Sequence, residues 1–268
     1  MNQLPFKAVA VDMDGTFLDD KKQYNKTLFR ALLDKMNKLG IRFIVSSGNQ
    51  LATLEEYFIE TRNEIAFVAE NGSYIVNQGK TIHHDNLNPD DINAILAFFA
   101  KYPEVHPILC GIKSAYILAD EPESFKQHAA FYHKKLQIVK DFNQLPDDIF
   151  LMLTCKLPDE ETLQFTDLVN QKFNKIIYAT SGGNGFIDFI HPETNKAAGL
   201  EKLLNSMDLT LKDLIAFGDG GNDVEMLNAA GLSYAMENGQ AVAKKAADKI
   251  APNNNDDGVL RVLAEYLL

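Results

Sequence analysis

The sequence predicts an α/β fold in which a doubly wound parallel sheet carries a second, inserted α/β domain. Short apolar runs, each ending in a turn rich in Asp, Ser, Asn or Gly, alternate with helical patterns at both ends of the chain. The pattern of strand-like and helix-like segments changes near residue 84. A chain of 268 residues with 46% hydrophobic content is long enough for two domains.

The first predicted elements are a buried strand, a capped helix and a second strand. Residues 8–11 (Ala-Val-Ala-Val) are apolar throughout, as expected of a parallel strand that is covered on both faces. Asn25 can cap a helix that Gly40 ends, because the apolar residues between them follow helical spacing: Leu28, Leu32, Met36 and Leu39. A second strand is expected at residues 41–45.

The next predicted elements lead out of the core and into the insert. After a strand at 65–69, residues 73–76 and 81–83 flank Asn77-Gln78-Gly79-Lys80 as the two strands of a β-hairpin do. In the insert, Pro89, Pro122 and Pro158 each suit the first turn of a helix. Strands are expected between these helices, at 114–118, 149–156 and 175–180.

The chain is expected to return to the core with a strand at 186–190, after which helices and strands alternate to the C-terminus. We therefore expect a Rossmann-like core formed by residues 1–83 and 186–268, with an inserted α/β domain at 84–185.

Two acidic turns follow predicted strands. Asp12 and Asp14 come directly after the first strand, and Asp219 and Asp223 follow the apolar run 214–217. Open α/β sheets bind ligands at the carboxyl ends of their strands. If these strands are neighbours, the four carboxylates converge on a site suited to Mg²⁺, with one carboxylate available for nucleophilic attack. The alternative is an ordinary turn, in which Asp side chains bond their own backbone.

Two further segments suit a phosphate group. Ser47 and Gly48 lie at a strand-to-helix turn that offers a hydroxyl and free amides, although such residues also serve as simple helix caps. Lys196 lies near the start of a predicted helix, where its charge opposes the helix dipole. A dianionic phosphate beside several carboxylates requires such a positive charge.

These motifs, taken in order, resemble those of the haloacid dehalogenase superfamily, and more narrowly the Cof-type sugar phosphatases with a large inserted cap of the C2 type. The resemblance extends to Ala69-Glu70-Asn71-Gly72 and to segments 110–116 and 180–188. One departure is Ser47-Gly48-Asn49, where many relatives carry Thr-Gly-Arg. Serine keeps the hydroxyl, but the loss of arginine removes a charge that could contact substrate.

The resemblance implies a phosphatase that works through an aspartyl-phosphate. Asp12 is the expected nucleophile, and Asp14 is the expected general acid and base. The expected Mg²⁺ ligands are the side chains of Asp12 and Asp219 and the backbone carbonyl of Asp14, with Asp223 acting through water. The phosphoryl oxygens are expected to bind the following groups: Lys196, Ser47, Asn222 and the backbone amides of Met13 and Gly48.

Substrate specificity is expected to reside in the cap, which can close over the site. The candidate substrate contacts there are Lys113, Ser114, Ser181 and Asn184. Two other functions stay open. A phosphomutase could return the phosphoryl group to a sugar, and a non-enzymatic receiver-type module could store it on an aspartate as a signal.

The amino-acid composition limits the kinds of molecule that the protein is expected to bind. A net charge of -11 argues against a nucleic-acid or anionic-membrane surface, which would need clustered Lys and Arg. The two cysteines, Cys110 and Cys155, have no metal-binding spacing, and no secretory or membrane segment is recognised, so we expect a reducing cytoplasm. The expected partner is a small phosphorylated molecule, and the oligomeric state stays open.

Overall fold

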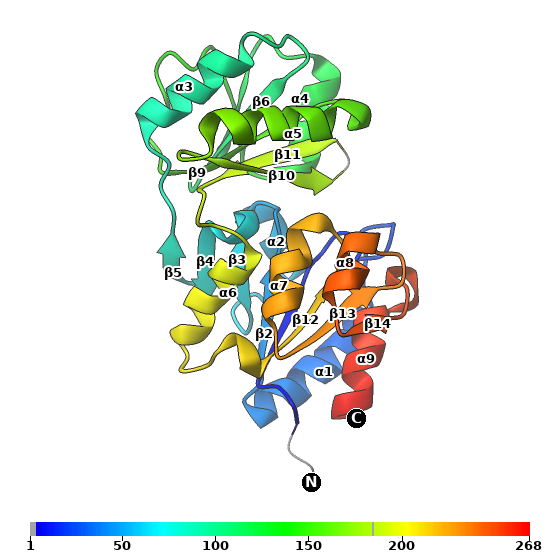
Figure 1. Cartoon of the computed structure of the whole chain (residues 1–268). Coiled ribbons are helices and arrows are strands. Elements are labelled where there is room, and N and C mark those ends of the chain that lie inside the picture. Colours follow the sequence, from blue (N-terminus) through cyan, green and yellow to red (C-terminus); the bar gives the residue numbers. More distant parts are fainter. Residues whose placement is uncertain (1–3, 184) are drawn as a thin grey trace.

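The computed structural model describes residues 4–183 and 185–268. Its chain forms two sheets, one above the other in Figure 1. The larger has the order β14-β13-β12-β1-β2-β3-β4-β5. Its six parallel strands are β1 (Ala8–Val11), β2 (Arg42–Ser46), β3 (Ala66–Ala69), β12 (Leu214–Gly218), β13 (Leu232–Met236) and β14 (Lys249–Ala251). The antiparallel hairpin β4 (Tyr74–Asn77) and β5 (Lys80–His84) extends it.

Helices cover both faces of the larger sheet. Alternate residues of each strand point to opposite sides, so each strand contributes to the packing on both faces. Val9 and Val11 pack with α1 (Lys26–Leu39), α2 (Leu51–Tyr57) and α9 (Gly258–Leu267). Ala8 and Ala10 pack with α6 (Lys196–Asn205), α7 (Val224–Ala229) and α8 (Ala241–Ala246). The predicted doubly wound fold is therefore confirmed.

The smaller sheet belongs to the insert and has the order β10-β11-β9-β6-β7-β8. Its strands are β6 (His106–Gly111), β7 (Ala115–Leu118), β8 (Leu136–Val139), β9 (Phe150–Lys156), β10 (Tyr178–Gly183) and β11 (Phe186–Ile190). Helices α3 (Pro89–Phe99) and α5 (Asp159–Phe173) contribute to one apolar cluster, and α4 (Glu123–Tyr132) contributes to another. We call this α/β unit the cap.

Local sequence signals are confirmed where they act within one element. Asn25 caps α1 by accepting a hydrogen bond from the amide of Leu28, and Gly40 ends the helix with a φ of 72°. The hairpin forms as predicted. Pro89 begins α3, whereas Pro122 and Pro158 stand one position earlier, as N-cap residues of their helices.

The predicted return to the core at residues 186–190 is wrong. These residues form β11, which pairs with β10 and β9 in the cap sheet. All five side chains of β11 are buried, so the run looks like a core strand in either sheet. The chain passes between the two units at residues 85–88, after β5, and again at 191–195, before α6.

Hydrogen bonds hold the cap against the core, the domain that contains the larger sheet. The side chain of Gln50 makes two with the backbone of Lys135, at 3.0 and 2.9 Å. The Thr53 hydroxyl donates to the carbonyl of Tyr132, and the hydroxyl of Thr194 donates to Asp85 where the two connecting segments meet. The cap is therefore docked on the core.

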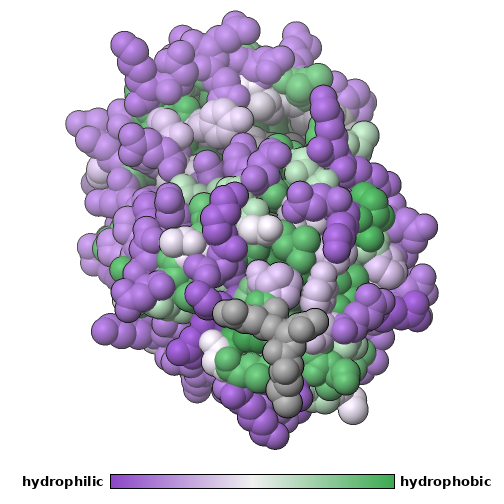
Figure 2. All heavy atoms as spheres, turned by 60° about the horizontal axis from the view of Figure 1, so that its bottom comes forward, coloured by the Kyte–Doolittle hydropathy of each residue, from purple (hydrophilic) through white to green (hydrophobic). Residues whose placement is uncertain are grey.

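Polar side chains cover most of the face seen when the lower end of the molecule is turned forward, and the apolar ones gather in separate patches (Figure 2). Within residues 4–183 and 185–268, none of the helices combines the length and apolar character that crossing a membrane requires.

Candidate active site

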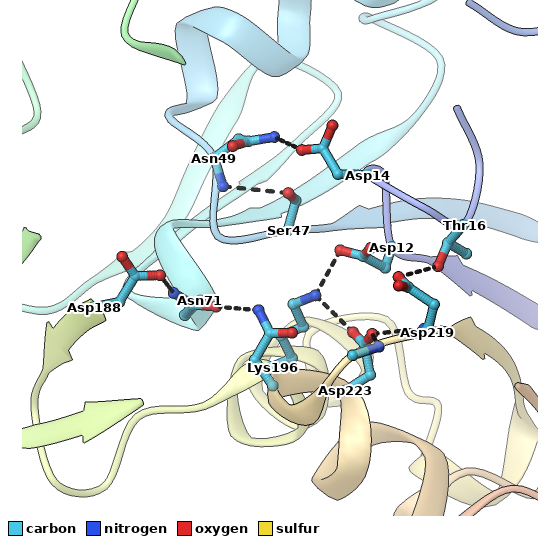
Figure 3. Close-up of polar contacts among 12 residues, drawn as sticks. Asp12, Asp14, Thr16, Ser47, Asn49, Asn71, Asp188, Lys196, Asp219 and Asp223 are labelled. Carbon is cyan, nitrogen blue, oxygen red and sulfur yellow. Dashed lines mark hydrogen bonds and ion pairs between the residues drawn. The ribbon is translucent and has the colours of Figure 1, made fainter. Parts of the chain in front are cut away.

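The two acidic turns meet at one edge of the larger sheet. Val11 of β1 lies beside Phe217 of β12, so the turns that follow these strands leave the sheet together. Asp12, Asp219 and Asp223 each place a carboxylate oxygen within 4.8 Å of the others. The hydroxyl of Thr16 donates to Asp219 at 2.9 Å (Figure 3). Three of the four carboxylates predicted to converge therefore do so, and the side chain of Asp14 is not part of this group.

Lys196 lies at the centre of this group. Its ammonium donates to Asp12 Oδ1 and Asp223 Oδ1, both at 2.6 Å, and the residue is 1% exposed. It opens α6, whose N-cap Asn195 accepts a hydrogen bond from the amide of Ala198. The other oxygen of Asp223 accepts the backbone N–H groups of Asp219 and Gly220. Asp223 therefore orients both the lysine and the acidic turn.

The charges at this site are not balanced. Burial raises the pKa of Asp12 well above its usual range; Lys196 opposes the rise, while Asp223 and Asp219 add to it. Burial and Asp223 raise the pKa of Asp219 to about 6. Three close carboxylates share a single ammonium, so a bound cation would relieve the repulsion between them. Carboxylate and carbonyl oxygens suit a hard divalent ion such as Mg²⁺.

Three of the predicted phosphate-binding residues, Ser47, Gly48 and Asn222, line a cavity of about 350 Å³ between the core and the cap. Asp12 and Asp219 line it too, whereas Lys196 and Met13 are not among its lining residues. Ser47 and Gly48 come from the end of β2, and Asn222 comes from the turn after β12. Asn222 donates to Asn71, which in turn donates to Asp188 of the cap strand β11. Met13 is a buried residue whose proposed contribution is its backbone amide.

Asp14 points away from Lys196, toward Asn49 (Figure 3). The Asn49 side chain donates to Asp14 Oδ2 at 2.7 Å, and the ammonium of Lys22 donates to Asp14 Oδ1 at 2.5 Å. Lys22 was not among the predicted site residues, because nothing in the sequence distinguishes it from the neighbouring Lys21. Both Lys22 and Asn49 line the cavity.

The cap residues that line the cavity differ from the expected ones. The cavity-lining residues from the cap are Tyr132, His133, Met152, Thr154, Phe186 and Asp188. The expectation that Lys113 and Ser114 face substrate is not met. Lys113 is exposed and pairs with Asp147 at 3.0 Å, and the buried Ser114 donates to the carbonyl of Ala115.

In the turn at 112–114, the Asp148 carboxylate accepts the backbone amides of Lys113 and Ser114, and neither residue is among those that line the cavity. Of the other two expected contacts, Asn184 and the side chain of Ser181 lie outside what the structure describes.

Residues 9–263 match the haloacid dehalogenase-like hydrolases. The chain belongs to this family. It is 41% identical, over 264 residues, to the 5-amino-6-(5-phospho-D-ribitylamino)uracil phosphatase YbjI of Escherichia coli (strain K12), with 98% of this chain and 97% of that protein covered. The expected superfamily is thereby confirmed, and the expected enzyme class, a phosphoric monoester hydrolase, agrees with it.

Solved structures of other proteins share the fold. SMU.1108c from Streptococcus mutans UA159 superimposes with a TM-score of 0.94 at 35% identity, covering 98% of this chain and 99% of that one. The sugar phosphatase BT4131, described as a member of HAD subclass IIB, gives a TM-score of 0.83 at 21% identity, covering 97% and 98%. Both cover the cap as well as the core.

Proposed function

We propose that this hydrolase is a Mg²⁺-dependent phosphatase of small phosphate monoesters, foremost phosphorylated sugars or sugar alcohols, acting through an aspartyl-phosphate. The observation that carries the proposal is the buried Lys196, whose ammonium is held between Asp12 and Asp223. Of the carboxylates around it, Asp12 and Asp219 line the cavity. A carboxylate beside a fixed ammonium can accept an incoming phosphate dianion at low electrostatic cost.

The proposed reaction has two steps. A carboxylate oxygen of Asp12 attacks phosphorus, the bond from phosphorus to the alcohol oxygen breaks, and that oxygen keeps the electron pair and takes a proton from Asp14. Water then attacks the phosphorus of the aspartyl-phosphate while Asp14 accepts its proton. Inorganic phosphate leaves, and the carboxylate of Asp12 is restored.

The other residues bind and orient. Lys196, Ser47 and Asn222, with the amides of Met13 and Gly48, would hold phosphoryl oxygens. The side chains of Asp12 and Asp219 and the carbonyl of Asp14 would hold Mg²⁺, with Asp223 acting through water. When bound, the ion supplies positive charge against the charge that develops on the phosphoryl group.

The first substrate to test is 5-amino-6-(5-phospho-D-ribitylamino)uracil, because the relative named for it covers nearly the whole chain. The cap wall suits such a molecule. Phe186 and Tyr132 are in edge contact and offer aromatic surface for a planar ring, while Thr154 and Asp188 offer polar groups to hydroxyls. The proposal includes a cytoplasmic location, supported by the free, buried Cys110 and Cys155.

The test is phosphate release from this compound, a set of sugar phosphates, nucleotides and an aryl phosphate, with and without Mg²⁺. We expect many turnovers for the wild type, and for Asp12→Asn a loss of at least about a thousandfold, because the nucleophile is gone. Replacement of the exposed Asp120 by Asn is the matched control and should leave the rate unchanged.

Other results would contradict the proposal. Transfer of phosphate to a sugar without release would indicate a mutase. Release of one equivalent per chain would indicate a regulatory module, and activity retained in Asp12→Asn would remove the nucleophile assignment.

A further inference from the structure

Lys22 holds one oxygen of the Asp14 carboxylate while Asn49 holds the other. The Lys22 Nζ to Asp14 Oδ1 distance is 2.5 Å, and the Asn49 Nδ2 to Asp14 Oδ2 distance is 2.7 Å. We propose that Lys22 is a positioning residue, which together with Asn49 fixes the Asp14 side chain for proton transfer to the leaving alcohol. The inference rests on the proposed function, in which Asp14 is the general acid.

The loop that carries Lys22 is built around this placement. Lys22 has a φ of 60°, in the left-handed region that side chains other than glycine rarely adopt. The carboxylate of Asp19 holds the loop by accepting the amides of Lys21 and Gln23, at 2.9 and 2.8 Å. The Lys22 amide closes the turn onto the carbonyl of Asp19. Strained backbone of this kind persists where the surrounding structure imposes it, often at functional sites.

The position of the ion pair also fits proton transfer. Lys22, Asp14 and Asn49 all line the cavity next to Asp12, and the cap residue Tyr132 lines it too. Both members of the ion pair are only partly exposed, with side-chain exposures of 30% and 31%. A carboxyl group with a donor on each oxygen has little freedom to rotate. Catalysis by a positioned acid depends on such restriction, because small displacements of the reacting groups lower the rate.

Lys22 could instead only bind the phosphate or only support the fold. A positioning role differs from these two because its effect on the rate depends on the leaving group. An alkoxide is a poor leaving group and needs a proton as the bond to phosphorus breaks, whereas 4-nitrophenolate departs without one. Loss of a positioning residue should therefore slow alkyl phosphates more than aryl phosphates. Loss of a lysine that only binds the phosphate, or only supports the fold, should slow both equally.

The experiment measures kcat/KM for a sugar phosphate that the wild type hydrolyses and for 4-nitrophenyl phosphate. This parameter covers the steps up to loss of the leaving group, so the later hydrolysis of the aspartyl-phosphate does not enter. The variants are Lys22→Met and Lys22→Gly, of which the second removes the ammonium while suiting the left-handed backbone. Lys22→Arg tests rescue by another cation. Lys21→Met, at the exposed neighbouring lysine, is the control.

We expect the ratio of the two kcat/KM values, alkyl over aryl, to fall about tenfold or more in Lys22→Met and Lys22→Gly. Lys22→Arg should recover part of it, and Lys21→Met should leave it unchanged. An unchanged or raised ratio in both Lys22→Met and Lys22→Gly, with Lys22→Gly melting at the wild-type temperature, would overturn the inference.

Asp14→Asn separates this result from a failure of the proposed function. If Asp14→Asn lowers the ratio and the Lys22 variants do not, the general acid is correctly assigned and the inference about Lys22 is wrong. If Asp14→Asn also leaves the ratio unchanged, the assignment of Asp14 as general acid fails, and the inference fails with it.

Discussion

At the scale of single residues, Glu70 is the most exceptional side chain next to the site. It is 1% exposed, has a φ of 51°, and its Oε2 has no hydrogen-bond partner. Burial raises its pKa to about 8, and the carboxylate of Asp188 adds to the rise. A carboxyl group in this position is held in its neutral form, because an unpaired buried charge is costly.

This pKa predicts how stability depends on pH. Between the unfolded value of 4.5 and about 8, the folded chain keeps a proton on Glu70 that the unfolded chain has lost. The free energy of unfolding should therefore fall as pH rises through this window, by roughly 1.4 kcal/mol for each pKa unit and a few kcal/mol in all. Glu70→Gln should remove this contribution. The free energy of unfolding of the variant, measured by urea unfolding, should therefore rise relative to that of the wild type between pH 5 and pH 9.

The control for this prediction is Glu104→Gln, at an exposed carboxylate. Its stability should follow that of the wild type across the same pH range. A difference between Glu70→Gln and the wild type that stays constant from pH 5 to pH 9 would show that Glu70 is ionised in the folded protein.

The sequence predicted the site residues that follow strands, and missed those whose partners lie far along the chain. Asp12, Asp219 and Lys196 were predicted because strand ends and helix starts can be recognised locally. The contact of Asn71 with Asp188 joins residues 117 positions apart, and nothing near either residue indicates it. Lys113 and Ser114 were misplaced because their amides bind Asp148, which is 35 and 34 positions distant from them, respectively.

At the scale of elements, the turn after β1 depends on one glycine. Gly15 has a φ of 79°, and a Cβ there would lie 2.7 Å from Asp219 Oδ2. Gly15→Ala should therefore do two things. It should strain the backbone by about 1 kcal/mol, and it should displace the Asp219 carboxylate. We expect a several-fold rise in the Mg²⁺ concentration that half-saturates phosphate release, measured by titration of the metal.

Gly40 provides the matched control for this turn. It also has a left-handed backbone, with a φ of 72°, but a Cβ there would have nothing within 4 Å. Gly40→Ala should show a similar loss of stability without a change in the Mg²⁺ requirement. An equal change in both variants, or in neither, would contradict the role of close approach at Gly15.

Element type was easier to predict from the sequence than element partners. The cap of α1, its terminating glycine and the hairpin β4–β5 are set by neighbouring residues, so their patterns were sufficient. The sheet to which β11 belongs was not predictable in this way. Its side chains are buried in the cap, and the apolar run would serve equally well in the core, so only the pairing with β9 and β10 distinguishes the two.

At the scale of the whole molecule, the cap and the core each supply part of the cavity wall. Gln50 stands at the start of α2 in the core, and it is 5% exposed. It donates through Nε2 to the Lys135 carbonyl and accepts the Lys135 amide through Oε1. This pairing ties the segment after α4 to the turn at Ser47 and Gly48, for which we propose phosphate binding.

Gln50→Ala should loosen the docked cap, because two hydrogen bonds of about 1 kcal/mol each are lost. We expect kcat/KM for a sugar phosphate to fall several-fold, since the cap wall would lie over the bound substrate for less of the time. Hydrogen exchange at the Lys135 amide should become faster in the same variant. Gln144→Ala, at an exposed glutamine of the cap, should change neither quantity. Faster exchange with unchanged kcat/KM would show that the contact holds the cap without limiting catalysis, and would contradict the coupling between cap docking and turnover.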